Sequence, residues 1–155
     1  MNRAPLPADA VATMTGLELM RAMIDGSLPG APIAALMNMR GGSAEPGVMV
    51  FEGVPGPEHY NPLGTVHGGF AATLLDSCMG CAVHTTLPAG TGYTSIDINI
   101  TFVRAMSAAT GTVTARGEVI NAGRRVATVR GTLTDAAGKV LAHGTSSCLI
   151  FGPQQ

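Results

Sequence analysis

The alternation of hydrophobic and polar positions is sharpest in the second half of the chain, where it predicts four β-strands. Residues 94–103 alternate strictly, which would place Ile96, Ile98, Ile100 and Phe102 on one face of a strand and Ser95, Asp97, Asn99 and Thr101 on the other. Residues 111–121 and 124–134 flank Ala122-Gly123, and a second turn sequence at 135–138 precedes residues 140–150. These turn signals predict that the four strands form a meander.

The first half of the chain gives shorter elements. Apolar residues recur at helical spacing over 15–25, and Gly26 follows them as a stop signal. Residues 33–39 are interpreted as a first strand that Gly41-Gly42 breaks, and residues 48–52 as a second. Residues 1–10 contain two prolines and no periodicity, so they are expected to be loosely ordered. We therefore expect one domain over residues 1–155, in which 1–32 form an N-terminal extension with a short helix.

Residues 67–86 predict a long helix that is apolar on all sides. Its one formal charge is Asp76, and no other Asp, Glu, Lys or Arg occurs between Glu58 and Asp97. A helix without a polar face has to be enclosed, which predicts an α+β fold with an antiparallel sheet wrapped around this helix. A carboxylate is costly to bury without a partner. Asp76 is therefore either a paired structural acid or a group that performs chemistry.

Composition narrows the class of protein. Charged residues make up 12% of the 155 residues, the net charge is −1, and there is no basic footprint for nucleic acid. Soluble domains usually contain about 25% charged residues, so we expect part of the surface to be covered, most simply by a second copy of the chain. Neither an apolar run of about 18 residues nor a signal-peptide pattern occurs. The expectation is a cytoplasmic protein without a membrane partner.

Three cysteines are present, and Cys78 and Cys81 form a Cys-x-x-Cys pair inside the predicted helix. An odd number of cysteines argues against a disulfide framework. We interpret the pair as small core residues, with a redox or zinc role as the alternative. No metal and no cofactor are predicted.

The start of the long helix is suited to bind a carbonyl oxygen. Gly68 and Gly69 lie in its first turn, where free N–H groups and the helix dipole favour an oxyanion. His67 and Asp76 are nine residues apart, which is half a turn out of phase and about 13 Å along a helix. They cannot serve one small site within one chain. If both are catalytic, each site is shared between two subunits of a dimer.

These residues carry a resemblance to a known family. The set resembles the motif of hotdog-fold thioesterases of the phenylacetate-degradation (PaaI-like) type, close to the acyl-CoA thioesterase 13 group, and consists of Asn61, His67, Gly68, Gly69, Leu75, Asp76 and Gly80. Residues 94–100, the turn at 102–105 and Gly123-Arg124-Arg125 also resemble that family, and the resemblance covers residues 33–151. A departure is Ala105, where the family often has proline.

The resemblance implies a function and a role for each site residue. The chain would hydrolyse an acyl-CoA or aryl-CoA thioester, as a homodimer or a dimer of dimers (a homotetramer). Asp76 would be the general base or the nucleophile, and the Gly68 N–H would polarise the thioester carbonyl. Asn61 would help to hold the carbonyl or the water, His67 would orient the loop or contact substrate, and Ser95 would position the water near Asp76.

Plainer roles remain open for most of these residues. His67 can be a helix cap, Asn61 a turn residue before Pro62, and Ser95 an ordinary polar strand residue. Arg124 and Arg125 are either a solvated hairpin or a contact for the phosphates of CoA. Two rival functions also remain: a hotdog acyl-CoA hydratase or dehydratase, and a non-catalytic acyl-CoA-binding protein.

Overall fold

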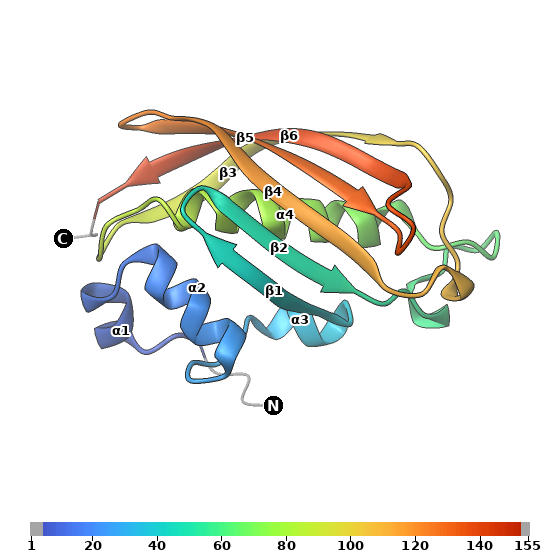
Figure 1. The fold of residues 1–155 in the computed structure, drawn as a ribbon, viewed down its shortest axis with the longest axis horizontal. Helices are drawn as coiled ribbons and strands as arrows, with labels where there is room; N and C mark the ends of the chain where they lie inside the picture. Colours follow the sequence, from blue (N-terminus) through green and yellow to red (C-terminus); the bar gives the residue numbers. More distant parts are fainter. Residues whose placement is uncertain (1–4, 153–155) are drawn as a thin grey trace.

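The computed structural model describes residues 5–152 (Figure 1). Its α-helices are α1 (Ala8–Thr13), α2 (Gly16–Asp25), α3 (Pro32–Leu36) and α4 (Gly68–His84). Its strands are β1 (Met39–Glu45), β2 (Val48–Gly53), β3 (Gly92–Phe102), β4 (Val113–Ala122), β5 (Val126–Thr134) and β6 (Val140–Phe151). Two short 3₁₀ turns, Pro57–His59 and Ala108–Thr110, lie in the loops before α4 and after β3.

The six strands form one antiparallel sheet in the order β1-β2-β4-β5-β6-β3, and the sheet curves around α4 (Figure 1). The expected antiparallel sheet around one long central helix is therefore present. The expected four-strand meander is wrong for β3, because only β4, β5 and β6 follow one another as neighbours. The two turn signals join those three strands. Residues 103–112, between β3 and β4, are too long for a hairpin turn, and β3 pairs with β6 at the sheet edge.

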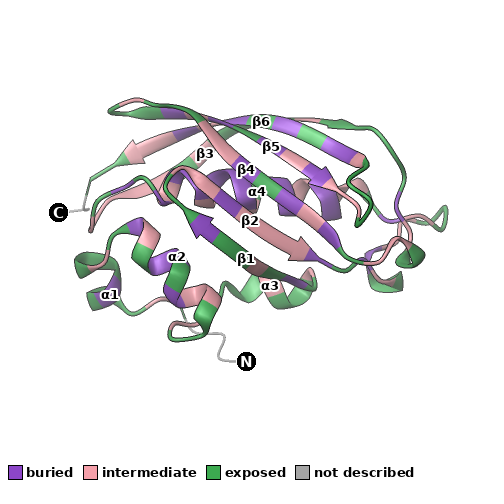
Figure 2. Ribbon diagram, viewed as in Figure 1, coloured by how far each residue is buried: buried purple, intermediate pink, exposed green. Residues whose placement is uncertain are grey.

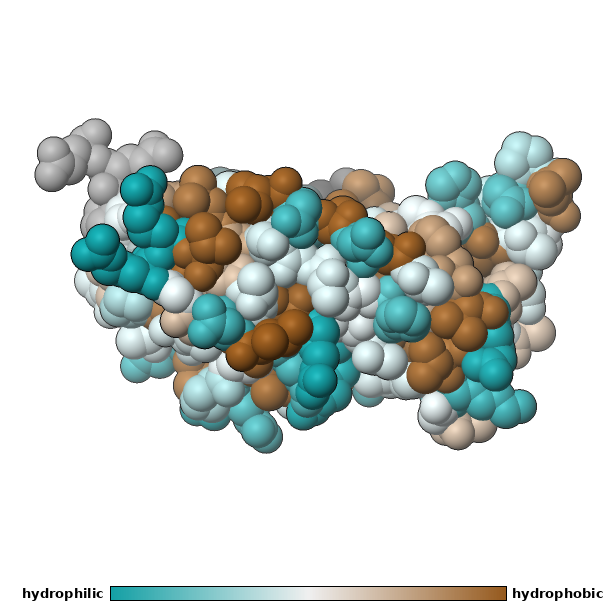
Figure 3. Space-filling view, turned by 90° about the horizontal axis from the view of Figure 1, so that it is seen from above, coloured by the Kyte–Doolittle hydropathy of each residue, from teal (hydrophilic) through white to brown (hydrophobic). Residues whose placement is uncertain are grey.

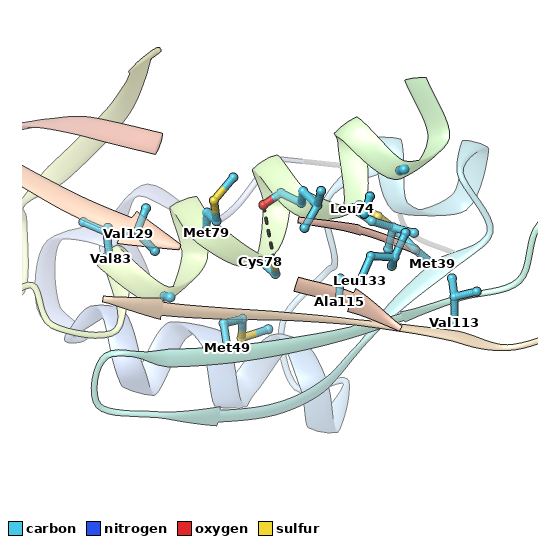
Figure 4. Close-up of a cluster of buried hydrophobic side chains, with 14 of the residues drawn as sticks. Met39, Met49, Leu74, Cys78, Met79, Val83, Val113, Ala115, Val129 and Leu133 are labelled. Carbon is cyan, nitrogen blue, oxygen red and sulfur yellow. Dashed lines mark hydrogen bonds between the residues drawn. The ribbon is translucent and has the colours of Figure 1, made fainter. Parts of the chain in front are cut away.

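Helix α4 is buried on the side that faces the sheet (Figure 2). Its buried side chains pack with those of β2, β4 and β5 in the main core, part of which is drawn in Figure 4. Gly117 and Gly131 lie opposite each other on β4 and β5. A Cβ atom at Gly117 would overlap the backbone carbonyl of Cys78, and one at Gly131 would lie 2.9 Å from Met79 Cγ. The two glycines therefore allow the helix to lie directly on the sheet.

The N-terminal half confirms one expected helix and corrects one strand. Helix α2 begins at a Thr15 cap, where Thr15 and Glu18 form a capping box, and ends at Gly26 with φ 84°. Residues 33–39, expected as a strand, instead form most of α3 because Pro32 at the first helical position fixes a helical φ. Gly41 lies inside β1, where α2 packs so closely that a Cβ would come 2.7 Å from Ile24 Cγ1.

The segment before α2 is partly ordered, contrary to expectation. Residues 1–4 lie outside the described residues, but α1 forms one and a half turns and buries Ala10. Within residues 5–152, no helix combines the length and the apolar character needed to cross a membrane. The face seen in Figure 3 mixes polar and apolar side chains, with the apolar ones in separate patches.

Candidate active site

His67 caps α4 and leaves one N–H group free at its start. The His67 Nδ1 atom accepts a hydrogen bond of 2.8 Å from Gly69 N–H, and the Phe70 N–H donates to the His67 carbonyl. The His67 N–H is itself fixed on the His59 carbonyl at 2.8 Å. Among the described residues, the Gly68 N–H makes no hydrogen bond. This donor, at the positive end of the helix dipole, is available for a carbonyl oxygen.

A cavity opens beside Gly68. It has a volume of about 450 Å³, and its lining includes Val66, Gly68, Phe102, Arg104 and Met106. The Phe102 ring, at the end of β3, lies over Gly68, where a Cβ atom would come 3.1 Å from Phe102 Cζ. Glycine at this position therefore lets the Phe102 ring pack closely against the start of α4. The alternation in the sequence places Phe102 on a strand face and gives no sign of this contact.

Asn61 uses its side chain within its own loop. Its Oδ1 atom accepts hydrogen bonds from Leu63 N–H at 2.9 Å and Thr65 N–H at 3.4 Å, and its Nδ2 group donates to Thr65 Oγ1 at 2.9 Å. This is the turn role that the sequence left open. A contact with substrate carbonyl or water stays a prediction for Asn61.

Asp76 lies in the middle of α4 and is hydrogen-bonded by Ser95. The Ser95 hydroxyl, from β3, donates to Asp76 Oδ1 at 2.9 Å. The two residues that the resemblance places together are therefore neighbours in the structure. The expected burial of Asp76 is wrong for the single chain, in which this carboxylate is exposed.

The exposure of Asp76 has a simple geometric cause. The sheet covers one side of α4, and the opposite side, including Ala72, Thr73 and Ser77, is only partly covered. These positions recur at helical spacing with Asp76, so they form one open face. The expectation that the helix is apolar on all sides is therefore wrong. It carries a narrow stripe of small and polar residues around the carboxylate.

The two ends of the candidate site are not brought together within one chain. Gly68 begins α4 and Asp76 follows two turns later on the same continuous helix, about 12 Å farther along its axis. Ser95 adjoins Asp76, whereas Phe102 adjoins Gly68, at the other end of β3. Within one chain, the Asp76 carboxylate and the free Gly68 N–H are therefore two separate groups, and their roles stay predictions.

The cysteines near Asp76 are neutral thiols. Burial raises the pKa of Cys81 to about 11, and it also raises that of Cys78 well above its ordinary value. Cys78, Cys81 and Cys148 are all free thiols. Cys81 Sγ lies 3.8 Å from Tyr93 Oη, and the Tyr93 ring covers Gly80. Among the described residues, no group of His, Cys, Asp and Glu side chains has the arrangement of a metal site.

Arg124 and Arg125 lie exposed in the β4–β5 hairpin. The hairpin closes through Gly123 N–H to the Val126 carbonyl, and the Arg125 carbonyl accepts from Ile150 N–H. In the sheet, Ala127, Cys148 and Ser95 are aligned in register across β5, β6 and β3. The two arginines therefore lie at the end of the sheet that carries Ser95. Their contact with CoA phosphates stays a prediction.

Comparison with known proteins finds that the chain is similar to thioesterases. The profile of the thioesterase superfamily matches residues 63–142, which include His67, Gly68, Asp76 and Ser95. The human protein acyl-coenzyme A thioesterase 13 is 35% identical over 103 residues, covering 66% of this chain and 72% of its own length.

Two solved structures of similar fold are of proteins connected with phenylacetic acid degradation. A phenylacetic acid degradation-related protein from Ralstonia eutropha JMP134 is 26% identical with a TM-score of 0.76, over 84% of this chain and 98% of its own. The Escherichia coli PaaI protein, from the phenylacetic acid degradation operon, shares the fold with a TM-score of 0.78 at 19% identity, over 92% of this chain and 98% of its own.

An antiparallel sheet curved around one long helix, together with these matches, defines a hotdog-fold thioester hydrolase. The chain belongs to the thioesterase superfamily. Within it, the chain is related to acyl-coenzyme A thioesterase 13 and is similar to PaaI of Thermus thermophilus, with 28% identity and a TM-score of 0.69 over 76% of this chain and 97% of that one.

Proposed function

We propose that this protein hydrolyses acyl-CoA thioesters to a free acid and CoA. The observation that carries the proposal is the Asp76 carboxylate, held by the Ser95 hydroxyl at 2.9 Å on the open face of α4. The 35% identity to acyl-coenzyme A thioesterase 13 supports an acyl-CoA as the substrate class. An activated acyl group requires one positioned water, one base and one oxyanion donor.

In the proposed reaction, Asp76 accepts a proton from a water molecule that attacks the thioester carbonyl carbon. The electron pair of the carbonyl moves onto its oxygen, which the Gly68 N–H stabilises. When the carbonyl re-forms, the carbon–sulfur bond breaks, and CoA leaves as the thiolate and takes up the proton. Ser95 keeps one carboxylate oxygen occupied, so that the other faces the water. Direct attack by Asp76, followed by hydrolysis of the anhydride, uses the same residues.

We propose further that the active site forms between two subunits, with Asp76 from one and Gly68 from the other. β3 is one of the two edge strands of the sheet, and its Ile96, Ile98 and Phe102 are 57%, 43% and 57% exposed. An edge strand with large exposed apolar side chains is a natural surface for another chain. A second copy on this edge and on the open face of α4 would remove Asp76 from bulk water. The assembly is a homodimer or a dimer of dimers.

The test is release of free CoA thiol from a panel of aliphatic and aryl acyl-CoA esters, followed by Asp76→Asn. A base contributes about a hundredfold or more to a rate, so Asp76→Asn should lose at least that factor while its circular dichroism is unchanged. Asp135→Asn, at a half-buried carboxylate in the β5–β6 turn, is the matched control and should keep the wild-type rate.

Three results would contradict the proposal. Turnover of the ester with gain or loss of water and an intact thioester would indicate a hydratase or dehydratase. Binding of CoA esters across the panel without any turnover would indicate a binding protein. A folded Asp76→Asn variant with full thiol release would remove Asp76 from the mechanism.

A further inference from the structure

Ser95 reaches Asp76 because β3 contains a bulge. Strict alternation would place Ser95 on the same face as Asp97, Asn99 and Thr101. In the structure Ser95 pairs with Cys148 and Asp97 pairs with the next residue of β6, Ser147, so Ile96 is an additional residue. Cys148 is fully buried, whereas Asp97 and Asn99 are exposed. The bulge thus moves Ser95 from the outer face to the face that carries α4.

Two hydrogen bonds that Asp97 accepts stabilise this bulge. A bulge leaves backbone groups without their partners in the strand ladder, and each such group needs another partner. The Asp97 carboxylate accepts the Ser147 N–H at 2.9 Å, and the Asp97 carbonyl accepts the buried Ser146 hydroxyl at 2.7 Å. The Asp97 side chain therefore takes the place of a backbone acceptor next to the additional residue.

We propose that Asp97 is a positioning residue for the thioesterase site, acting through the bulge on Ser95 and through Ser95 on Asp76. This inference rests on the proposed function. Asp97 lies on the outer face of β3 and does not touch the substrate. Its carboxylate is used as a hydrogen-bond acceptor, and the amide oxygen of asparagine can accept the same N–H group. The role therefore depends on the acceptor atom and not on the charge.

The experiment compares Asp97→Ala, Asp97→Asn and Ser95→Ala in thiol release. Asp97→Ala should lower kcat about tenfold, the size expected for loss of a hydrogen bond to a charged group, with KM changed less than about twofold. Asp97→Asn should restore most of kcat. The double variant Ser95→Ala/Asp97→Ala should be no slower than Ser95→Ala alone, because both changes remove the same contact.

The matched control is Asp135→Ala. Like the Asp97 carboxylate, the Asp135 carboxylate accepts from the backbone: its Oδ1 accepts the Ala137 and Lys139 N–H groups at 2.9 Å each. It lies, however, at the tip of the β5–β6 hairpin. This variant should keep the wild-type kcat. Equal losses of kcat in Asp97→Ala and Asp97→Asn would overturn the inference. A double variant whose loss of kcat is the product of the two single losses would also overturn it.

A crystal structure of Asp97→Ala decides the same question without any activity. The inference predicts that Ser95 Oγ lies more than about 3.5 Å from Asp76 Oδ1 in the variant, beyond hydrogen-bond distance. An unchanged bulge with the Ser95 bond intact would overturn it. If the wild-type protein released no thiol from any ester, the proposed function would fail while this distance still tested the role of Asp97 in the bulge.

Discussion

Ser95 Oγ donates a hydrogen bond of 2.9 Å to Asp76 Oδ1, which joins the edge strand β3 to the middle of α4. Among the described residues, only the Ser95 hydroxyl donates a hydrogen bond to the Asp76 carboxylate. It fixes the rotation of a group that the open side of the helix otherwise leaves free. The contact thus connects the conformation of β3 to the proposed base.

Ser95→Ala should slow the reaction without unfolding the protein. Loss of this contact leaves Asp76 free to rotate, and the expected decrease in kcat is about tenfold. Thiol release measures it. Thr94→Ala is the control, because Thr94 is exposed on the neighbouring position of the same strand, and it should keep the wild-type kcat. Equal rates for Ser95→Ala and the wild type would mean that the contact is only structural.

Gly117→Ala should destabilise the fold strongly. The added Cβ would overlap the Cys78 carbonyl, a backbone group of α4 that cannot move alone. Overpacking of this kind costs about 3 kcal/mol in the free energy of unfolding. Gly30→Ala is the control, since no atom lies within 4 Å of its Cβ position, and it should change stability by less than about 0.5 kcal/mol. Urea unfolding at one fixed protein concentration measures both, and similar stabilities would contradict the packing described for α4.

His84 should make stability fall in mild acid. Burial lowers the pKa of His84 below its ordinary value of 6.5, so the unfolded chain binds a proton more readily than the folded chain. The contribution of neutral, buried His84 to the free energy of unfolding is therefore complete above about pH 6.5. It is lost as the pH falls through the lower folded-state pKa.

His84→Gln should reduce the difference in unfolding free energy between pH 7.5 and pH 5.5. The exposed His143 provides the control, and His143→Gln should leave that difference unchanged. An unchanged pH dependence in His84→Gln would show that burial of this ring does not contribute to acid sensitivity.

The fold was largely predictable because its strongest local signals agree with its tertiary structure. The apolar helix before Pro88, the turn at Gly123 and the stop at Gly26 all lie where the sequence predicts them. The prediction of a strand over residues 33–39 was wrong because a short apolar run has no periodicity that separates a strand from a helical turn. The prediction that β3 is part of a meander was wrong because its pairing with β6 is long-range, and no local turn signal specifies it.

The sequence proposes Asp76, Ser95 and Gly68 as site residues, and their catalytic roles stay predictions. The resemblance places Ser95 next to Asp76, as the structure does, yet strict alternation would turn Ser95 away from the helix. The bulge at Ile96 reverses that direction. An additional residue puts the positions before it out of phase with those after it, so Ser95 changes face while Asp97 and Asn99 keep theirs. The sequence carries no proline or glycine to mark this position, so the proposed role of Asp97 has no local signal.

The central claim is that one active site takes Gly68 and Asp76 from different subunits. Gly68→Pro removes the N–H at the first position of α4, where proline suits the helix, and His67 before it has an extended ψ of 138° that tolerates proline. Gly68→Ala keeps the N–H and is the matched control for the added Cβ. We expect Gly68→Pro to lose about a hundredfold in kcat, as for other oxyanion donors, and Gly68→Ala to lose far less.

The most direct measurement mixes Gly68→Pro with Asp76→Ala, each nearly inactive alone, and follows thiol release after subunit exchange. Half of the randomly exchanged dimers are mixed, and each mixed dimer has one intact site, so about a quarter of the wild-type rate should return. Native mass spectrometry confirms the exchange. No recovery of activity in a fully exchanged mixture would contradict the shared site.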